Sequence, residues 1–210
     1  NKYAKVNVKV LIILILVTAA IGISLFTARH VRRKFLSKMD LNAGQAAFEQ
    51  KEWPEAFKKL RGYLSRNPDN LEILKKYAKS ALSIHPLSTE AITAAIGAYR
   101  RVIQLEPLDE IAYERLAMLY TGIGNFEELA YIARARITHA PDDRKAPLWL
   151  ADALFRLHNT DEAKQVLLNF LTDLDALEDK HPEYVQACAM MSRIILDGNN
   201  TIEAKTQTLE

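Results

Sequence analysis

Residues 110–141 read EIAYERLAMLYTGIGNFEELAYIARARITHAP, and this stretch decides the fold. Its apolar residues recur at i, i+3, i+4 and i+7, as in EIAYERLAMLY, and strand-like alternation is absent. That period predicts helices. Pro141 at the end of the stretch cannot continue a preceding helix, so it marks the turn into the next segment.

The same pattern recurs along the chain at a nearly constant interval. Ala56, Ala95, Leu129, Ala163 and Ala204 each stand near the start of a helical segment, at spacings of 39, 34, 34 and 41 residues. Pro68, Pro107 and Pro141 follow the first three of these positions by a constant 12 residues. Because a fixed period of this length is the signature of a repeat architecture, we predict a repeated helix pair of about 34 residues.

The residues at matching positions identify the repeat. In the third repeat they are Tyr113, Leu116, Ala117, Tyr120, Gly124, Phe126 and Pro141, with Leu129 where Ala is usual. The first repeat supplies Gly44, Trp53, Ala56, Leu60 and Pro68, with Asp40 in place of a large leading residue. The second supplies Leu74, Tyr77, Ala78, Ala81, Ala95, Tyr99 and Pro107, and the fourth Leu150, Ala151, Leu154, Ala163, Leu167 and Phe170. Over residues 37–210 this pattern resembles the tetratricopeptide repeat.

The resemblance implies an all-α fold, in which residues 37–210 form an α-solenoid of antiparallel helix pairs wound into a right-handed superhelix. We place the repeats at residues 37–70, 71–109, 110–143, 144–182 and, incomplete, 183–210. Small residues at Gly44, Ala78, Ala117 and Ala151 are expected where the helices of a pair approach closely. In the last repeat we expect a first helix over residues 183–197 that stops at Gly198, and a chain that continues beyond Glu210.

The resemblance also implies a groove lined by fixed positions of each first helix. Carried onto this chain, the candidate groove residues are Leu41, Gln45, Phe48, Lys75, Lys79, Leu82, Glu114, Met118, Leu148, Asp152 and Phe155, accompanied by Lys38, Glu72, Ile111 and Lys145. Such a mixture of apolar and charged side chains suits an extended peptide or an amphipathic helix. It does not suit the carboxylate clamp for a chaperone C-terminus, since Gln45 stands where the first clamp Asn would be. For each of these residues, solvation or contact with a neighbouring repeat is the alternative reading.

A second feature precedes the repeats: residues 10–28, VLIILILVTAAIGISLFTA, carry no charge. As a helix these 19 residues would be about 28 Å long, against a hydrocarbon core of about 30 Å. We therefore predict a transmembrane helix at residues 10–28, between a basic flank at residues 1–9 and a basic juxtamembrane segment at residues 29–36. A cleaved signal peptide ending near Val17-Thr18-Ala19 is the alternative. Small residues four apart, at Thr18 and Gly22 and at Ala20 and Ser24, would permit contact with other transmembrane helices.

The charges flanking this run bear on its orientation. Lys2, Lys5 and Lys9 precede it, and five bases follow it: Arg29, Arg32, Arg33, Lys34 and Lys38. By the positive-inside rule this imbalance favours a cytoplasmic arm, and we expect a single-pass protein of a bacterial inner membrane. Missing upstream bases would cancel the difference, so a periplasmic arm stays open. The bases also suit anionic lipid headgroups, although their role in topology explains them equally well.

Composition excludes several other functions. Beyond residue 39 the chain has 20 bases against 26 acids, which argues against a nucleic-acid partner. Cys188 is the only cysteine, and the five histidines are scattered without a nearby nucleophile. We find no catalytic motif and expect neither enzymatic activity, nor a cofactor, nor a metal.

Three functions remain. The first is a membrane-anchored scaffold or adaptor whose groove takes a protein or peptide partner and which holds or assembles subunits of a membrane-associated complex. The second is a regulatory segment of a longer enzyme or secretion machine. The third is a precursor-peptide receptor on an outer mitochondrial membrane.

Overall fold

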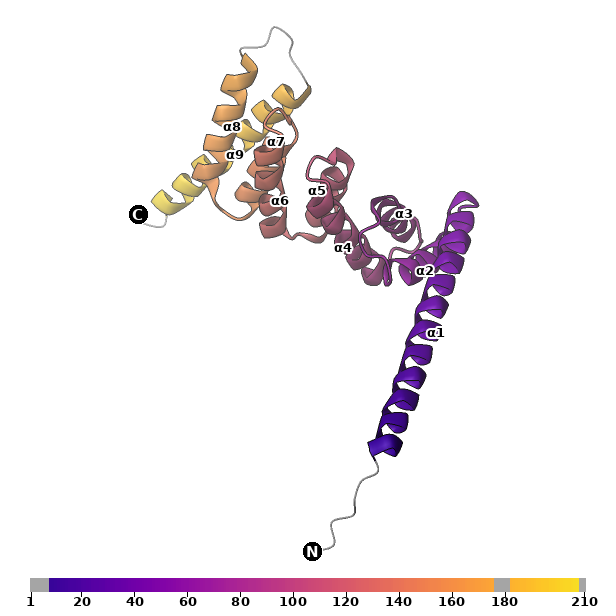
Figure 1. Cartoon of the computed structure of the whole chain (residues 1–210). Coiled ribbons are helices and arrows are strands. Elements are labelled where there is room, and N and C mark those ends of the chain that lie inside the picture. Colours follow the sequence, from indigo (N-terminus) through magenta and orange to yellow (C-terminus); the bar gives the residue numbers. More distant parts are fainter. Residues whose placement is uncertain (1–7, 176–181, 208–210) are drawn as a thin grey trace, which may run out of the picture. The chain divides into compact units, whose positions relative to one another are not determined.

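The computed structural model describes the backbone of residues 8–175 and 182–207, and the side chains of residues 14, 16–172 and 182–197. All regular structure within these ranges is helical, which confirms the predicted all-α class (Figure 1). The helices are α1 (Val8–Glu49), α2 (Trp53–Leu64), α3 (Leu71–Leu82), α4 (Thr89–Leu105), α5 (Glu110–Ile123), α6 (Phe126–His139), α7 (Ala146–Arg156), α8 (Thr160–Asp175) and α9 (Pro182–Gln207).

The helices form two compact units, Asn1–Pro86 and Leu87–Glu210. In the first unit, α2 packs against both α1 and α3. In the second, each helix from α4 to α9 packs against the next one in the chain, and α9 also contacts α7. Packing between sequence neighbours is how a repeat protein buries apolar faces that no single pair could bury alone.

The prolines mark the connections between pairs, as predicted. Pro68 lies between α2 and α3, Pro107 between α4 and α5, and Pro141 between α6 and α7. Two of the helices that follow begin at capping side chains: Asn70 accepts a hydrogen bond from the backbone N–H of Ile73 at 3.2 Å, and Asp109 accepts one from that of Ala112 at 2.7 Å.

A left-handed residue recurs in the turn within a pair. Gly124 ends α5 with φ of 71°, and Lys51 and His158 adopt φ of 60° and 61° in the corresponding turns of the first and fourth repeats. Only Gly124 is the residue type that this conformation favours, because it lacks the Cβ that clashes there. The residue types at positions 51 and 158 therefore do not indicate the left-handed conformation that Lys51 and His158 adopt.

Close helix approach occurs at the predicted small residues. A Cβ atom added to Gly44 on α1 would lie 2.6 Å from Cδ2 of Leu60 on α2, and Leu60 is fully buried. Ala78, Ala117 and Ala151, at the matching positions of the other repeats, are all buried. Close approach is therefore confirmed at Gly44, and at the three alanines the structure confirms burial.

The prediction that a helix stops at Gly198 is wrong, because α9 runs continuously from Pro182 to Gln207. One glycine inside a helix costs only about 1 kcal/mol relative to alanine, which is too little to end a helix by itself. The repeat boundaries proposed above remain predictions.

The predicted membrane segment lies in α1, which continues without a break into the first repeat. Every side chain from residue 16 to residue 35 is exposed. No helix in the described part of the chain is both long and apolar enough to cross a membrane. The predicted span also includes residues 10–13 and 15, whose side chains lie outside that part, so the transmembrane helix is not confirmed and stays a prediction.

The contact at Gly44 makes a testable prediction. Gly44→Leu should lower the free energy of unfolding by about 1 to 3 kcal/mol, because Leu60 has no space into which to move. Gly97→Leu on α4 is the matched control, since a Cβ there meets nothing within 4 Å. Urea denaturation of both full-length variants, followed by circular dichroism, measures the difference. Equal stability of the two would contradict the packing described here.

Candidate functional site

In the first unit, the candidate groove residues lie on the two first helices, α1 and α3. They are Leu41, Gln45 and Phe48 on α1 and Lys75, Lys79 and Leu82 on α3. All are half-buried except Lys79, which is exposed.

Phe48 already has partners within the chain. Its ring meets that of Trp53 edge-on, with 5.6 Å between the ring centroids. The ammonium groups of Lys76 and Lys79 both lie 5.6 Å from its centroid, a distance at which a cation is attracted to the ring face. Phe48 therefore joins α1 to α3, and any partner would have to contact its remaining exposed edge.

A second aromatic pair joins α2 to α3. The rings of Phe57 and Tyr77 stack with centroids 4.9 Å apart and an angle of 5° between their planes. Arg61 lies over the Phe57 ring at 4.5 Å, and its Nε donates to the Tyr77 hydroxyl at 3.3 Å. Sequence analysis assigned no role to Phe57 or Arg61, because nothing in the repeat pattern pairs them with Tyr77.

In the second unit, α5 presents apolar side chains to solvent. Ile111 is 62% exposed and Met118 is 52% exposed. They stand seven residues apart, which places them on one face of the helix. This face of α5 carries the most exposed apolar side chains at any of the predicted groove positions.

The groove positions of α7 are less available. Leu148 is only 6% exposed and belongs to the core. Phe155 is half-buried beneath the guanidinium group of Arg193, which lies 5.7 Å from the ring centroid. Asp152 forms an ion pair with Arg156 at 3.6 Å. Of the three predicted α7 residues, Asp152 and Phe155 reach the surface.

The charges beside Ile111 and Met118 are paired. Lys145, at the start of α7, binds the carboxylates of Glu114 and Glu110, and its Nζ lies 3.2 Å from Oε1 of Glu110. The hydrogen bonds that Lys145 donates to Glu114 and, second, to Glu110 raise its pKa above the ordinary value. Lys145 thus serves both carboxylates, and the cluster of one ammonium group and two carboxylates beside the apolar face carries a net charge of −1.

A buried ion pair holds the start of α7 in place. Arg136 on α6 donates from Nε to Asp143 at 2.6 Å and from Nη1 to the carbonyl of Leu108 at 3.0 Å. Asp143 in turn accepts hydrogen bonds from the backbone N–H groups of Lys145 and Ala146, at 2.9 and 3.0 Å. This junction therefore ties the turn before α5 to the start of α7 and positions Lys145 beside Glu114.

The electrostatics of Asp143 follow from these contacts. Burial by itself raises the pKa of its carboxyl group, but the hydrogen bonds from Arg136, Ala146 and Lys145 outweigh burial and hold the pKa below its usual value. Asp143 is therefore charged in the folded protein at neutral pH.

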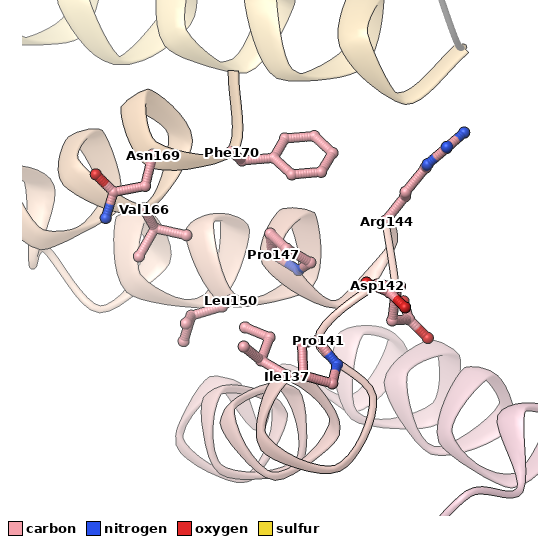
Figure 2. Close-up of a pocket in the computed structure, with 10 residues that line it drawn as sticks. Ile137, Pro141, Asp142, Arg144, Pro147, Leu150, Val166, Asn169 and Phe170 are labelled. Carbon is pink, nitrogen blue, oxygen red and sulfur yellow. The ribbon is translucent and has the colours of Figure 1, made fainter. Parts of the chain in front are cut away.

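A hollow of 660 Å³ lies elsewhere in the second unit, among α6, α7 and α8. Figure 2 shows apolar side chains around it, with Asp142 and Arg144 on one side. It is lined by Ile137, Pro141, Asp142, Asp143, Arg144, Pro147, Leu150, Val166, Asn169 and Phe170. No predicted groove residue belongs to it, because its walls come mainly from second helices and connections rather than from the exposed faces of first helices.

The predicted membrane flank is described only in part. Lys5 lies outside the described residues, and the side chain of Lys9 is not described. The side chains of Arg29, Arg32, Arg33 and Lys34 are all exposed on α1. Arg33 and Lys34 line a hollow between α1 and α2, whereas Arg29 and Arg32 do not.

No protein-family model matches the sequence, and no curated protein matches it. Many solved structures are similar in fold, among them the following three. The structure of Naa15/Naa10 bound to HypK-THB matches with 20% identity and a TM-score of 0.58, over 80% of this chain and 25% of that one. MamA AMB-1 matches with 16% identity and a TM-score of 0.53, over 68% and 75% of the two chains. A Podosopora anserina putative kinesin light chain with TPR-like repeats matches with 12% identity and a TM-score of 0.51, over 83% and 90%.

At these identities the likeness concerns the fold. The chain has the fold of tetratricopeptide-repeat proteins, which confirms the resemblance seen in the sequence.

The buried junction predicts a large effect of Asp143→Ala. Loss of this carboxylate should lower the free energy of unfolding by about 3 to 5 kcal/mol, because Arg136, whose side chain is 8% exposed, would be left buried without its charged partner. Asp161→Ala is the control, since Asp161 is fully exposed and should change stability by less than about 0.5 kcal/mol.

The same pair predicts a pH dependence. Since the pKa of Asp143 is lowered in the folded state, its contribution is fully present above the ordinary pKa of an aspartate and is lost as pH falls through the folded-state value. The stability of the unmodified chain should therefore decline below about pH 4 more steeply than that of Asp143→Ala. Parallel urea titrations at stepped pH measure this, and identical slopes would rule out the assigned role of the pair.

Proposed function

We propose that this chain is a membrane-anchored scaffold that holds a polypeptide partner on the exposed face of α5 and the adjoining start of α7. In this proposal residues 10–28 are the anchor, and the role of the protein is to hold or assemble subunits of a membrane-associated complex. The partner is a protein segment, either extended or an amphipathic helix.

The observation that carries the partner site is the exposure of Ile111 and Met118 next to charges that are already paired. Apolar side chains on one helix face, rimmed by polar groups, are typical of a protein-binding surface. Because Glu114 is paired with Lys145, a partner that covers Met118 would bury Glu114 together with its counter-ion. Glu110, 56% exposed at the start of α5, leaves one net negative charge at the edge of the face.

The other predicted groove residues enter the proposal as secondary contacts. Asp152 and Phe155 belong to the second unit, as Ile111 and Met118 do, and they are partly exposed. In the first unit, Leu41, Gln45, Lys75 and Leu82 are half-buried and Lys79 is exposed, so they offer a more polar surface. Leu148 drops out because its contacts are in the core.

The anchor rests on the uncharged run and on the exposure of α1. Leu16, Ile21 and Phe26, for example, are 63%, 54% and 71% exposed, and no other described helix covers them. Twelve of the 19 residues in the run are Val, Leu, Ile or Phe, so transfer into lipid is favoured by about 4 to 7 kcal/mol before the smaller cost of its polar residues. Tethering in this way would raise the local concentration of anything bound to the arm.

The partner site predicts which positions crosslink. A photoreactive phenylalanine derivative replacing Met118 should crosslink to a defined polypeptide in cells that express the protein, because position 118 is exposed on the proposed face. The same derivative replacing Tyr131, which is 64% exposed on α6, is the matched control and should not yield that adduct. Mass spectrometry identifies the products.

A second variant tests whether the apolar face supplies the binding energy. Ile111→Glu with Met118→Glu should weaken capture of the identified partner at least about tenfold, since two apolar contacts are lost. Tyr131→Glu with Leu168→Glu alters two exposed apolar residues on second helices and should leave capture unchanged. If the partner crosslinks to position 131 and not to position 118, the interface lies on the second helices of the pairs, and the proposed site is wrong.

The anchor predicts that charges in the middle of the run release the protein from the membrane. Val17→Arg with Ile21→Arg should move the full chain from the carbonate-resistant membrane pellet into the soluble fraction, because each arginine costs about 2.5 to 3.5 kcal/mol at the centre of a membrane helix. Phe35→Arg, on the same helix beyond the run, should remain in the pellet. An unmodified chain that is extracted by carbonate would refute the anchor.

A further inference from the structure

A hollow of 470 Å³ lies between α1 and α2 in the first unit, and its walls are strongly basic. From α1 it receives His30, Arg33, Lys34 and Lys38, and from the turn after α2 it receives Arg66. Basic residues thus make up five of its nine lining residues. The remaining polar groups, Ser37, Tyr63 and Asn67, all carry hydrogen-bond donors.

The positive charge of this hollow is largely uncompensated. Asp40 pairs with Arg66 at 2.7 Å. Within the described residues, no carboxylate lies within 4.0 Å of the charged groups of Arg33, Lys34 or Lys38. Three cations therefore face a common space without a counter-charge, which is the situation that an anionic ligand relieves.

The turn that follows α2 holds two donor side chains, Arg66 and Asn67, beside this space. Nη1 of Arg66 is engaged by Asp40 and by the carbonyl of Gly62 at 2.6 Å, which leaves Nε and Nη2 of the guanidinium group as donors. Asn67 donates from Nδ2 to the Ser37 hydroxyl at 2.7 Å, so that hydroxyl is free to donate its own proton. These contacts distinguish the hollow from a row of bases that only determines topology, because Arg66 and Asn67 lie in the turn after α2 and are not part of the predicted flank.

The place of the hollow along α1 suggests where its ligand comes from. His30 to Lys38 follow the end of the uncharged run by 2 to 10 residues on a continuous helix, which is about 3 to 15 Å along its axis. The headgroup layer on each side of a bilayer is about 5 to 7 Å thick. If residues 10–28 span the hydrocarbon core, the end of the hollow nearer His30 lies among the lipid headgroups. This step rests on the proposed anchor.

We propose that this hollow binds the phosphate group of an anionic phospholipid headgroup. Arginine and lysine side chains are the usual ligands of phosphate oxygens, and the hydroxyl groups of Ser37 and Tyr63 add two further donors. A headgroup held here would fix the first repeat against the membrane surface. The charge and the donors would accept a soluble phosphate in the same way, so the experiment has to separate the two sources.

The test is native mass spectrometry of the full chain released from detergent micelles in the presence of phosphatidylglycerol or phosphatidylcholine. We expect one phosphatidylglycerol molecule to bind in preference to phosphatidylcholine. Arg33→Gln with Lys38→Gln should lower that affinity at least about tenfold, whereas Arg29→Gln with Arg32→Gln should lower it less than about threefold. Both double variants remove the same charge from exposed positions of the same helix, and only the first pair lines the hollow.

Equal losses in the two double variants, or equal binding of the two lipids, would overturn the site. Inorganic phosphate added at millimolar concentration provides the second arm. If it displaces phosphatidylglycerol completely and binds the chain alone with the same dependence on Arg33 and Lys38, the headgroup assignment is wrong and the ligand is a soluble phosphate. The phosphate experiment needs no bilayer. A chain that carbonate extracts from the membrane and a hollow that binds no phosphate are therefore separate outcomes.

Discussion

The packing of the repeats depends on small residues at matching positions, and in the first repeat the small residue allows two helices to approach closely. At Gly44 the space that a side chain would occupy is already filled by Leu60, and the matching alanines of the later repeats are buried as completely as core residues. This approach lets each pair present a continuous apolar face to the next pair, which is the only place where that face can be buried. The surfaces available to partners exist because these contacts leave the outer sides of the first helices uncovered.

Polar contacts then determine which charged and apolar groups are exposed on the outer sides of the first helices. In the second unit, the buried pair of Arg136 and Asp143 fixes the start of α7, and Lys145 consequently neutralises Glu114 next to exposed Ile111 and Met118. In the first unit, contacts between aromatic rings and cations join the helices instead. Trp53, Lys76 and Lys79 cover part of the Phe48 ring that would otherwise be exposed. The two units thus present different surfaces from the same repeat pattern.

The continuity of α1 bears on how the parts of the chain work together. A helix of 42 residues, about 63 Å long by the rise of an α-helix, contains the uncharged run, the basic segment and the first helix of the first repeat. No flexible linker separates them, since the backbone hydrogen bonds run through. Residues 29–36 are therefore a rigid connection, and α2 can add its own side chains to those of the basic segment at a fixed place.

The sequence by itself determined the helical class, the period of the repeat and the small residues at the helix contacts, because periodicity and side-chain volume act locally and can be read along the chain. It also located the exposed faces of α5 and α1. Only the tertiary structure decided that Leu148 is buried, that Phe48 is already in contact with Lys76 and Lys79, that α9 passes Gly198, and that Arg66 and Asn67 join the basic residues of α1. Most of these outcomes depend on pairs of residues that lie far apart in the sequence, and the course of α9 depends on an energy summed over a whole helix. A local sequence pattern predicts neither of them.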